Sequence, residues 1–381
     1  MSRNIKVGIT QGDTNGVGCE IILKSLSHEN ICELFTPVII AGKRLIDEGI
    51  RRYIPEEEFK YQEANPNNEI NDGKINLITI ESKVDKITPG VPTRESGSDA
   101  VQALKKGVDL LREGKIDVLV TAPFCKENVQ SDEFSFPGHT EFLEAAAGND
   151  SKAMMILYND QLRVALVSIH VPLSEVVEKI SKEKIVETVM SFDKTLKRDF
   201  GIVRPRIALL SLNPHCGDGG LLGKEEKDII EPAIKEIKEK DVLAYGPYSS
   251  DGFFGHGDYS KFDGIVAMYH DQGLAPFKIL SRGEGVNFTA GLPFIRTSPD
   301  HGTAFPIAGK GIADETSMRN AIYGAVDIFR RRKLYDETCS NPLVQQVQAK
   351  PDREERTDAK QKTPNKNSAD SEKSKSEKIN K

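Results

Sequence analysis

Three of the seven histidines follow short apolar runs that are rich in β-branched residues. Such runs are typical of strands buried in a parallel sheet. Because ligands of an open α/β sheet bind beyond the carboxyl ends of its strands, the three imidazoles are expected at one edge, where they could share a divalent metal. Three protein ligands leave a coordination position free for substrate, as in catalytic sites. The histidines are His170 after 164–169, His215 after 207–212 and His270 after 265–269.

A simpler interpretation stays open for each histidine alone, because a histidine that follows a strand is often only a hydrogen-bonded polar cap. His28 lies in a polar turn and is expected at the surface, and His256 lies in a Gly-rich loop. The metal prediction therefore depends on the convergence of three residues. Imidazole ligands favour zinc or cobalt over magnesium, and manganese stays open.

Length, charge and cysteine content exclude several classes of protein. The 381 residues carry a net charge of -6, which argues against nonspecific nucleic-acid binding. Five cysteines without a CxxC pair fit free thiols in a reducing cytoplasm. No apolar stretch approaches the ~18 residues that a membrane span needs, and the first residues lack the apolar region of a signal peptide. We expect a cytoplasmic protein that does not associate with membranes.

Apolar runs alternate with helical patterns along most of the chain, which predicts an α/β fold with a largely parallel sheet. Helical stripes cover 19–26, 101–111 and 185–200; Ser98 is the expected N-cap of the second, Gly114 follows its end, and Gly201 stops the third. Strands are expected at 5–10, 37–41, 75–80, 117–121, 153–158, 163–169, 206–212, 264–269 and 286–289.

The composition changes near Asn341. Residues 350–381 include no aromatic residue and few large aliphatic ones, and they are rich in charged and small polar residues. Such a segment cannot bury enough apolar surface to offset the entropy lost on ordering. We expect 341–381 to be a disordered tail.

Two glycine-containing motifs carry weaker signals. The turn from Gly12 to Gly18 reads GxxxGxG, which is neither the dinucleotide fingerprint GxGxxG nor a P-loop. A helix predicted to begin near Gly138 could bind an anion at its N-terminus, with hydrogen bonds from His139 and Thr140. Simple N-capping by Thr140 is the alternative.

The stretch 269–304 places two cations in apolar, Gly-rich surroundings. Lys278 and Arg296 would be costly there unless they meet an anion. An acidic substrate would supply one, and structural ion pairs with Asp271 or Glu284 are the alternative.

Several motifs in this order resemble the 4-hydroxythreonine-4-phosphate dehydrogenase family of vitamin B6 biosynthesis, over roughly residues 4–335. HGTA (301–304) and AGKG (308–311) are also similar to the adenosine-binding segment of the wider isocitrate and isopropylmalate dehydrogenase fold. The family motifs are GHTEF (138–142), LNPH (212–215), MYHDQGL (268–274), GVN (285–287), GLPFIRTS (291–298) and DHGTA (300–304).

The resemblance implies an isocitrate/isopropylmalate dehydrogenase-like α/β fold, with two lobes around a central cleft. Lobe I, on the nucleotide side, would comprise 1–125 and 295–340; lobe II, on the metal, substrate and dimer side, would comprise 126–294. It implies an NAD- or NADP-dependent homodimer whose active site is shared between subunits. The site residues carried over are His170, His215 and His270 for metal, His139, Thr140, Lys278, Asn287 and Arg296 for substrate, His301, Gly302, Thr303 and Ala304 for cofactor, and Lys278, Asp271 and Asp251 for catalysis.

The implied reaction is metal-assisted oxidation of the C3 hydroxyl of a small phosphorylated hydroxy-amino acid, 4-phosphooxy-L-threonine, followed by decarboxylation. The first turn, Gly12-Asp13-Thr14-Asn15, and the segment 121–126 depart from the family pattern. A sister dehydrogenase acting on phosphoerythronate or phosphothreonate therefore stays open. A zinc hydrolase with the same three histidines and a catalytically silent binding protein are the alternatives from other classes.

Overall fold

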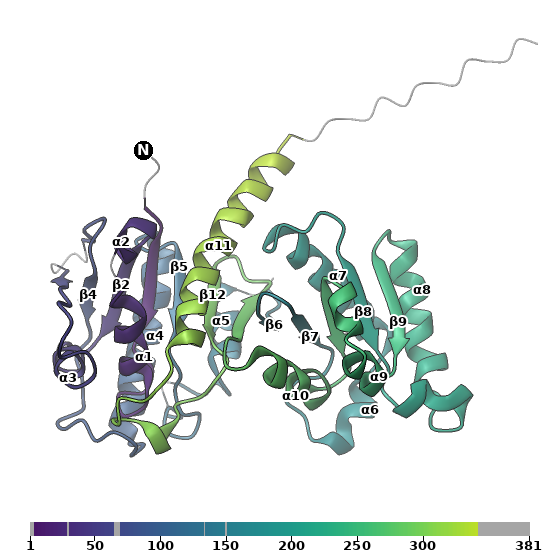
Figure 1. Cartoon of the computed structure of the whole chain (residues 1–381), viewed down its shortest axis with the longest axis horizontal. Helices are drawn as coiled ribbons and strands as arrows, with labels where there is room; N and C mark the ends of the chain where they lie inside the picture. Colours follow the sequence, from purple (N-terminus) through teal and green to yellow (C-terminus); the bar gives the residue numbers. More distant parts are fainter. Residues whose placement is uncertain (1–3, 29, 65–68, 133, 149–150, 342–381) are drawn as a thin grey trace, which may run out of the picture. The chain divides into compact units, whose positions relative to one another are not determined.

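The computed structural model describes residues 4–28, 30–64, 69–132, 134–148 and 151–341 (Figure 1). Their strands form one 12-stranded sheet in the order β3-β4-β2-β1-β5-β12-β11-β6-β7-β10-β8-β9. The predicted α/β class is confirmed. The strands are β1 (Lys6–Thr10), β2 (Thr36–Ala41), β3 (Gln62–Glu63), β4 (Asn76–Thr79), β5 (Val118–Thr121), β6 (Met154–Tyr158), β7 (Arg163–Leu166), β8 (Arg206–Leu210), β9 (Leu243–Tyr248), β10 (Gly264–Ala267), β11 (Val286–Ala290) and β12 (Ile295–Pro299).

The α-helices alternate with the strands along the chain, and Figure 1 labels them. They are α1 (Gly18–Leu26), α2 (Ile31–Leu34), α3 (Lys43–Tyr53), α4 (Arg94–Arg112), α5 (His139–Ala147), α6 (Val176–Lys179), α7 (Lys182–Arg198), α8 (Glu231–Glu239), α9 (Ser250–Gly255), α10 (His270–Ser281) and α11 (Thr316–Cys339). None of the described helices is long and apolar enough to cross a membrane.

The three strands that precede the three histidines are parallel neighbours. β10 pairs with β7 on one side and with β8 on the other, both in parallel. Their carboxyl ends therefore lie at the same edge of the sheet, as predicted. The centre of the sheet differs from the expected parallel pattern, because β6 is antiparallel to β7 and to β11, and β11 is antiparallel to β12.

The sheet has an apolar core on both faces, but only one of these cores is continuous. On one face, a single cluster extends from Ile39 through Val120 and Phe288 to Leu209. The helix α11 covers the central strands on this face, where Thr297 Oγ1 donates to Ala321 O at 2.7 Å (Figure 1). On the opposite face, two separate clusters form, one with α4 and α5 and the other with α9 and α10.

The second predicted helix begins earlier than expected. α4 starts at Arg94 rather than after Ser98, because Thr93 is the N-cap. The Thr93 side chain accepts from Ser96 N, and the Ser96 side chain accepts from Thr93 N, both at 3.1 Å. This reciprocal pair satisfies two backbone donors at the helix start. The expected end is confirmed, because α4 stops at Arg112, two residues before Gly114, which has a φ of +65°.

The strands of predicted lobe I fill one half of the sheet, from β3 to β12, and those of predicted lobe II fill the other half, from β11 to β9. Residues up to Asn341 form one compact unit, so the lobe boundaries stay a prediction. The predicted tail, 341–381, lies outside the described residues except for Asn341.

Candidate active site

A cavity of about 280 Å³ lies over the central strands. Alternate residues of a strand point to one face, and the strand register places Leu157, Asn287 and Ser298 side by side on the face where the apolar core is interrupted. Other walls come from α10, from the segment after β5 and from the segment after β12. The lining residues are Thr121, Pro123, Phe124, Lys126, Gly138, His139, Met155, Leu157, His270, Leu274, Lys278, Asn287, Arg296, Ser298, Pro299, Asp300, His301 and Gly302.

Arg296 supplies a buried cation to this cavity. Its side chain points from β12 and donates to Thr121 Oγ1 at 3.0 and 2.6 Å and to Thr289 Oγ1 at 3.0 Å. Only 3% of the residue is exposed, and burial lowers the pKa of Arg296 to about 9. Among the described side chains no carboxylate lies within ion-pair distance of it. Because a buried unpaired charge is costly, Arg296 is suited to receive an anion.

Lys278 lies on α10 beside the same cavity. Its Nζ donates to the backbone oxygen of Asp300 at 3.1 Å. Neither Lys278 nor Arg296 pairs with Asp271 or Glu284 in the described part of the chain, so the structural ion pairs considered as an alternative are not formed. Asn287 adds a buried side-chain oxygen that accepts no hydrogen bond from described residues. The cavity thus offers two cations and one free acceptor.

His139 begins α5, and its ring stacks on Phe124 with the ring centroids 3.8 Å apart. Burial, followed by the charges of Arg296 and Lys126, holds the pKa of His139 well below its usual value. The imidazole is therefore neutral at pH 7. Gly138, rather than Thr140, is the N-cap, so the capping role considered for Thr140 is wrong. Thr140 is half-buried in the first turn and does not line the cavity.

Two of the three candidate metal ligands lie close together. The ring centroids of His170 and His270 are 6.0 Å apart. Burial, followed by the charge of Lys126, lowers the pKa of His170, which favours the neutral imidazole that metals bind. His215 does not join them within one chain, since no group of three His, Cys, Asp or Glu side chains in the described residues could hold a metal.

The two aspartates that were assigned to catalysis lie beside histidines rather than in the cavity wall. Asp271 Oδ1 is 2.6 Å from His270 Nδ1, so it can fix the ring and leave Nε2 free. Asp251 accepts from Ser249 Oγ at 2.5 Å, a contact that lowers the pKa of its carboxyl; the charge of His215 lowers it further.

The predicted cofactor segment follows β12. His301 and Gly302 line the cavity, whereas Thr303 and Ala304 continue past it. Thr303 O accepts from Val17 N at 3.1 Å, so the Gly-rich turn before α1 holds this segment. A methyl group added to Gly302 would meet no atom within 4 Å, and open space therefore lies beside it.

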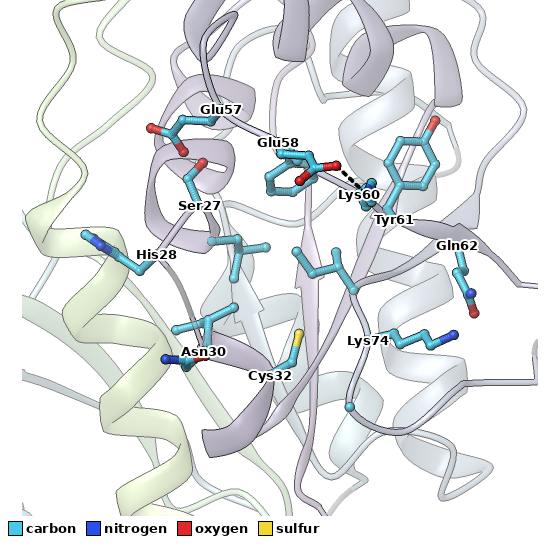
Figure 2. Close-up of a pocket in the computed structure, with 15 residues that line it drawn as sticks. Ser27, His28, Asn30, Cys32, Glu57, Glu58, Lys60, Tyr61, Gln62 and Lys74 are labelled. Carbon is cyan, nitrogen blue, oxygen red and sulfur yellow. Dashed lines mark ion pairs between the residues drawn. The ribbon is translucent and has the colours of Figure 1, made fainter.

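A larger hollow, of about 830 Å³, lies elsewhere, near the ends of α1 and α2 (Figure 2). His28, Cys32 and Tyr61 line it, and Glu58 pairs with Lys60 at its wall. It includes none of the predicted site residues. Its volume exceeds that of the candidate site, but it lacks a buried unpaired cation.

Several cavity residues were not among the predicted site residues, and three of them act on predicted ones or add charge. Thr121 holds the guanidinium of Arg296, Phe124 stacks on His139, and Lys126 adds a third cation. Thr121 ends the predicted strand 117–121, and Phe124 and Lys126 follow it, so their place at the carboxyl end of a strand was the available signal. The contact between Thr121 and Arg296 joins residues far apart in the sequence and had no local signature.

Comparisons with known proteins give a consistent result. The family model described as pyridoxal phosphate biosynthetic protein PdxA matches residues 33–325. A 4-hydroxythreonine-4-phosphate dehydrogenase of Bacteroides thetaiotaomicron is 50% identical over 348 residues, which cover 91% of this chain and 95% of the relative. A D-threonate 4-phosphate dehydrogenase of Cupriavidus necator is 37% identical, with 86% and 98% covered. The crystal structure of a 4-hydroxythreonine-4-phosphate dehydrogenase from Klebsiella pneumoniae superposes with a TM-score of 0.74 at 32% identity and covers 86% of this chain and 99% of that one.

Proposed function

Because the chain belongs to the pyridoxal phosphate biosynthetic protein PdxA family, a family of dehydrogenases that act on CH–OH groups, we propose that it oxidises 4-phosphooxy-L-threonine. The acceptor is NAD or NADP, and a divalent metal assists. The product, 2-amino-3-oxo-4-phosphooxybutanoate, is a β-keto acid. It loses CO2 by cleavage of the bond between the carboxylate and C2, whose electron pair passes to the C3 carbonyl as an enolate. C2 then takes up a proton, and 3-amino-2-oxopropyl phosphate remains.

The observation that carries the proposal is Arg296, buried in a cavity without a carboxylate partner. A phosphorylated amino acid offers a phosphate and a carboxylate. Arg296 binds one of these groups, with Thr121 and Thr289 fixing the plane of the guanidinium. Lys278, Lys126 and the neutral His139 add donors around it, and the free oxygen of Asn287 accepts from a substrate hydroxyl or ammonium group.

The donor set fits a metal of the zinc or cobalt type. His170 and His270 offer imidazoles whose ring centroids are 6.0 Å apart, and Asp271 orients the second one. The third ligand is His215 of a second copy of the chain, because His215 is not grouped with the other two within one chain. A homodimer with a shared site follows from this assignment.

The segment 301–304 fits a nucleotide at the side of the cavity. Gly302 is exposed beside open space, and the backbone of Thr303 is anchored to the turn before α1. When bound, the metal would lower the pKa of the substrate hydroxyl, and the nicotinamide would accept a hydride.

Residues of the chain supply the remaining steps. Arg296 and His139 hold the substrate so that its C3 faces the segment 301–304. Lys278 assists removal of the proton from the C3 hydroxyl, and the bond to the C3 hydrogen breaks as the carbonyl forms. Asp271 keeps His270 in one orientation while charge changes in the site, and Asp251 supplies a negative charge near His215.

A second substrate is supported by relatives such as that of Cupriavidus necator, whose name is D-threonate 4-phosphate dehydrogenase. Threonate carries a hydroxyl at C2 where the amino acid carries an ammonium group. The phosphate and carboxylate would meet the same cations, so the choice depends on the groups near C2. A zinc hydrolase is set aside by membership of a dehydrogenase family.

The experiment is a substrate series with the full chain, divalent metal and NAD or NADP, in which reduced nicotinamide is measured. We expect reduction with 4-phosphooxy-L-threonine. Reduction with phosphothreonate or phosphoerythronate alone would assign the sister activity, and no reduction with any of the three would overturn the proposal. His215→Ala is expected to remove metal binding and turnover together.

A further inference from the structure

The turn that carries His215 has an unusual backbone. Residues 214–220, the short helix η2, contain six consecutive residues with positive φ, from His215 to Gly220. The first five, His215, Cys216, Gly217, Asp218 and Gly219, have φ between 42° and 74°. L-amino acids other than glycine adopt this left-handed region only at a cost, and three of the five are not glycine. Strain of this kind persists only where surrounding contacts hold it.

Glu226 supplies those contacts from a turn of π-helix, η3 (Glu226–Ile230). Only 1% of the residue is exposed. Its Oε1 accepts from the backbone nitrogens of Leu212 and Asn213 at 2.9 and 2.7 Å, and its Oε2 accepts from Asn213 Nδ2 at 3.0 Å. The carboxylate therefore binds Leu212 and Asn213, which lie in the short connection between β8 and the turn.

The turn also packs directly on this carboxylate. A Cβ added to Gly217 would lie 2.6 Å from Glu226 Oε2, so a side chain at 217 cannot fit without moving the carboxylate. Among the described residues Glu226 has no cationic partner within ion-pair distance, and its charge is balanced only by hydrogen-bond donors. A buried carboxylate and a strained turn both reduce stability. Their coincidence at the turn of His215 points to a function.

We propose that Glu226 is a positioning residue: its buried carboxylate holds the left-handed turn 215–219 in the conformation that presents the His215 imidazole to a divalent metal. The inference rests on the metal site of the proposed function. Glu226 itself contacts neither metal nor substrate. It acts through Asn213 and the backbone, as outer partners of metal ligands commonly do.

The test is a titration of the full-length protein with Co²⁺, followed by the visible absorption of the bound ion. Glu226→Gln keeps the shape of the side chain but removes its charge and one acceptor. We expect Co²⁺ affinity to fall about 10- to 100-fold, the range typical of such outer partners. The matched control is Glu236→Gln on α8, whose carboxylate makes only surface pairs with Lys240 and Lys182 and should leave affinity unchanged.

A double-variant cycle separates positioning from general support of the fold. If Glu226 acts through His215, adding Glu226→Gln to His215→Ala causes no further loss of Co²⁺ affinity, while the losses of thermal stability still add. Wild-type affinity in Glu226→Gln, together with weak binding in His215→Ala, would overturn the inference and leave the metal site intact. Unchanged affinity in His215→Ala would refute the metal site itself.

If Glu226→Gln does not fold, alanine variants of two glycines in the turn test the role of Glu226 instead. Gly217 and Gly219 share positive φ, so alanine is strained at both, but only at 217 would the new methyl group press on Glu226; at 219 it meets nothing nearer than Lys227 Nζ at 3.9 Å. We expect Gly217→Ala to weaken Co²⁺ binding at least tenfold more than Gly219→Ala. Equal affinities in the two variants would contradict the role of Glu226.

Discussion

Two buried arginines near the centre of the fold differ in their partners. Arg332 donates to both carboxylate oxygens of Asp199, at 2.7 and 3.1 Å, and therefore has an internal counter-ion. Arg296 meets only threonine hydroxyls. The first arrangement is structural, whereas the second keeps a cation available for a ligand at some cost in stability.

Replacing each arginine by methionine tests this distinction. Arg296→Met removes a buried charge that has no counter-ion, so the free energy of unfolding should stay within about 1 kcal/mol of wild type or rise. Arg332→Met leaves Asp199 buried and unpaired, and should lower the free energy of unfolding by about 3–5 kcal/mol. Urea denaturation measures both values. A larger loss for Arg296→Met than for Arg332→Met would show that Arg296 is primarily structural.

His139 should make the protein sensitive to mild acid. Its pKa is lowered in the folded state by burial and by Arg296 and Lys126, so the unfolded chain binds a proton more readily. The neutral ring makes its full contribution to the free energy of unfolding above the unfolded pKa of about 6.5. This contribution is lost as the pH falls below that value, by at most about 1.4 kcal/mol per pH unit. His139→Gln should flatten this dependence, as measured by urea denaturation at pH 7.5 and 5.5. If the free energy of unfolding falls by the same amount between these two pH values in both proteins, the pKa of His139 is not lowered in the folded state.

At the level of elements, the sequence predicted buried strands well and polar ones poorly. All nine expected strands are present, because continuous apolar runs such as 206–212 mark strands covered on both faces. β3, β9 and β12 were missed: β3 consists of two exposed polar residues, β9 includes Gly246 and Pro247, and β12 includes Arg296 and Ser298, which point into the cavity. Residues retained for a site interrupt the pattern by which a strand is recognised.

The start of α4 gives a direct test of the corrected helix boundary. Thr93→Ala removes the N-cap acceptor and should cost about 1 kcal/mol. Ser98→Ala, at the position first expected to be the cap, replaces a serine inside the helix and should be neutral or slightly stabilising. Thermal unfolding of the two variants distinguishes them. The opposite order would place the helix start at Ser98.

At the level of the whole molecule, the sequence identified some of the residues that meet in the cavity, such as His139, Asn287 and Arg296, but not the geometry that joins them. The convergence of β7, β10 and β8 followed from general rules for parallel strands. The cavity itself depends on the antiparallel register of β11 with β6 and β12, which brings Asn287, Leu157 and Arg296 to one face. Such pairings of distant segments have no local signature. The family resemblance implied metal ligands from both subunits, but the sequence did not indicate that His215 is the histidine that lies apart from the other two within one chain.

A shared site predicts complementation between inactive variants. His270→Ala and His215→Ala should each be inactive, because each lacks one ligand. In a mixed dimer, one of the two sites would combine an intact His270 with an intact His215 from the other subunit. Random exchange should therefore restore about a quarter of wild-type activity. If mixed dimers form, as seen by native mass spectrometry, yet no activity returns, the ligands do not come from two subunits.

The central claim is that the cavity over the central strands binds a phosphorylated hydroxy acid on the unpaired cation of Arg296. Calorimetric titration with 4-phosphooxy-L-threonine tests it without requiring turnover. Arg296→Met should weaken binding by about 100-fold, since a hydrogen bond between charged groups contributes about 1.5–3 kcal/mol. Arg163→Met is the matched control, because Arg163 is also partly buried without a described ion-pair partner but lines a different cavity, beside α11. The account predicts wild-type affinity for Arg163→Met and weak binding for Arg296→Met; equal affinities in all three proteins would contradict it.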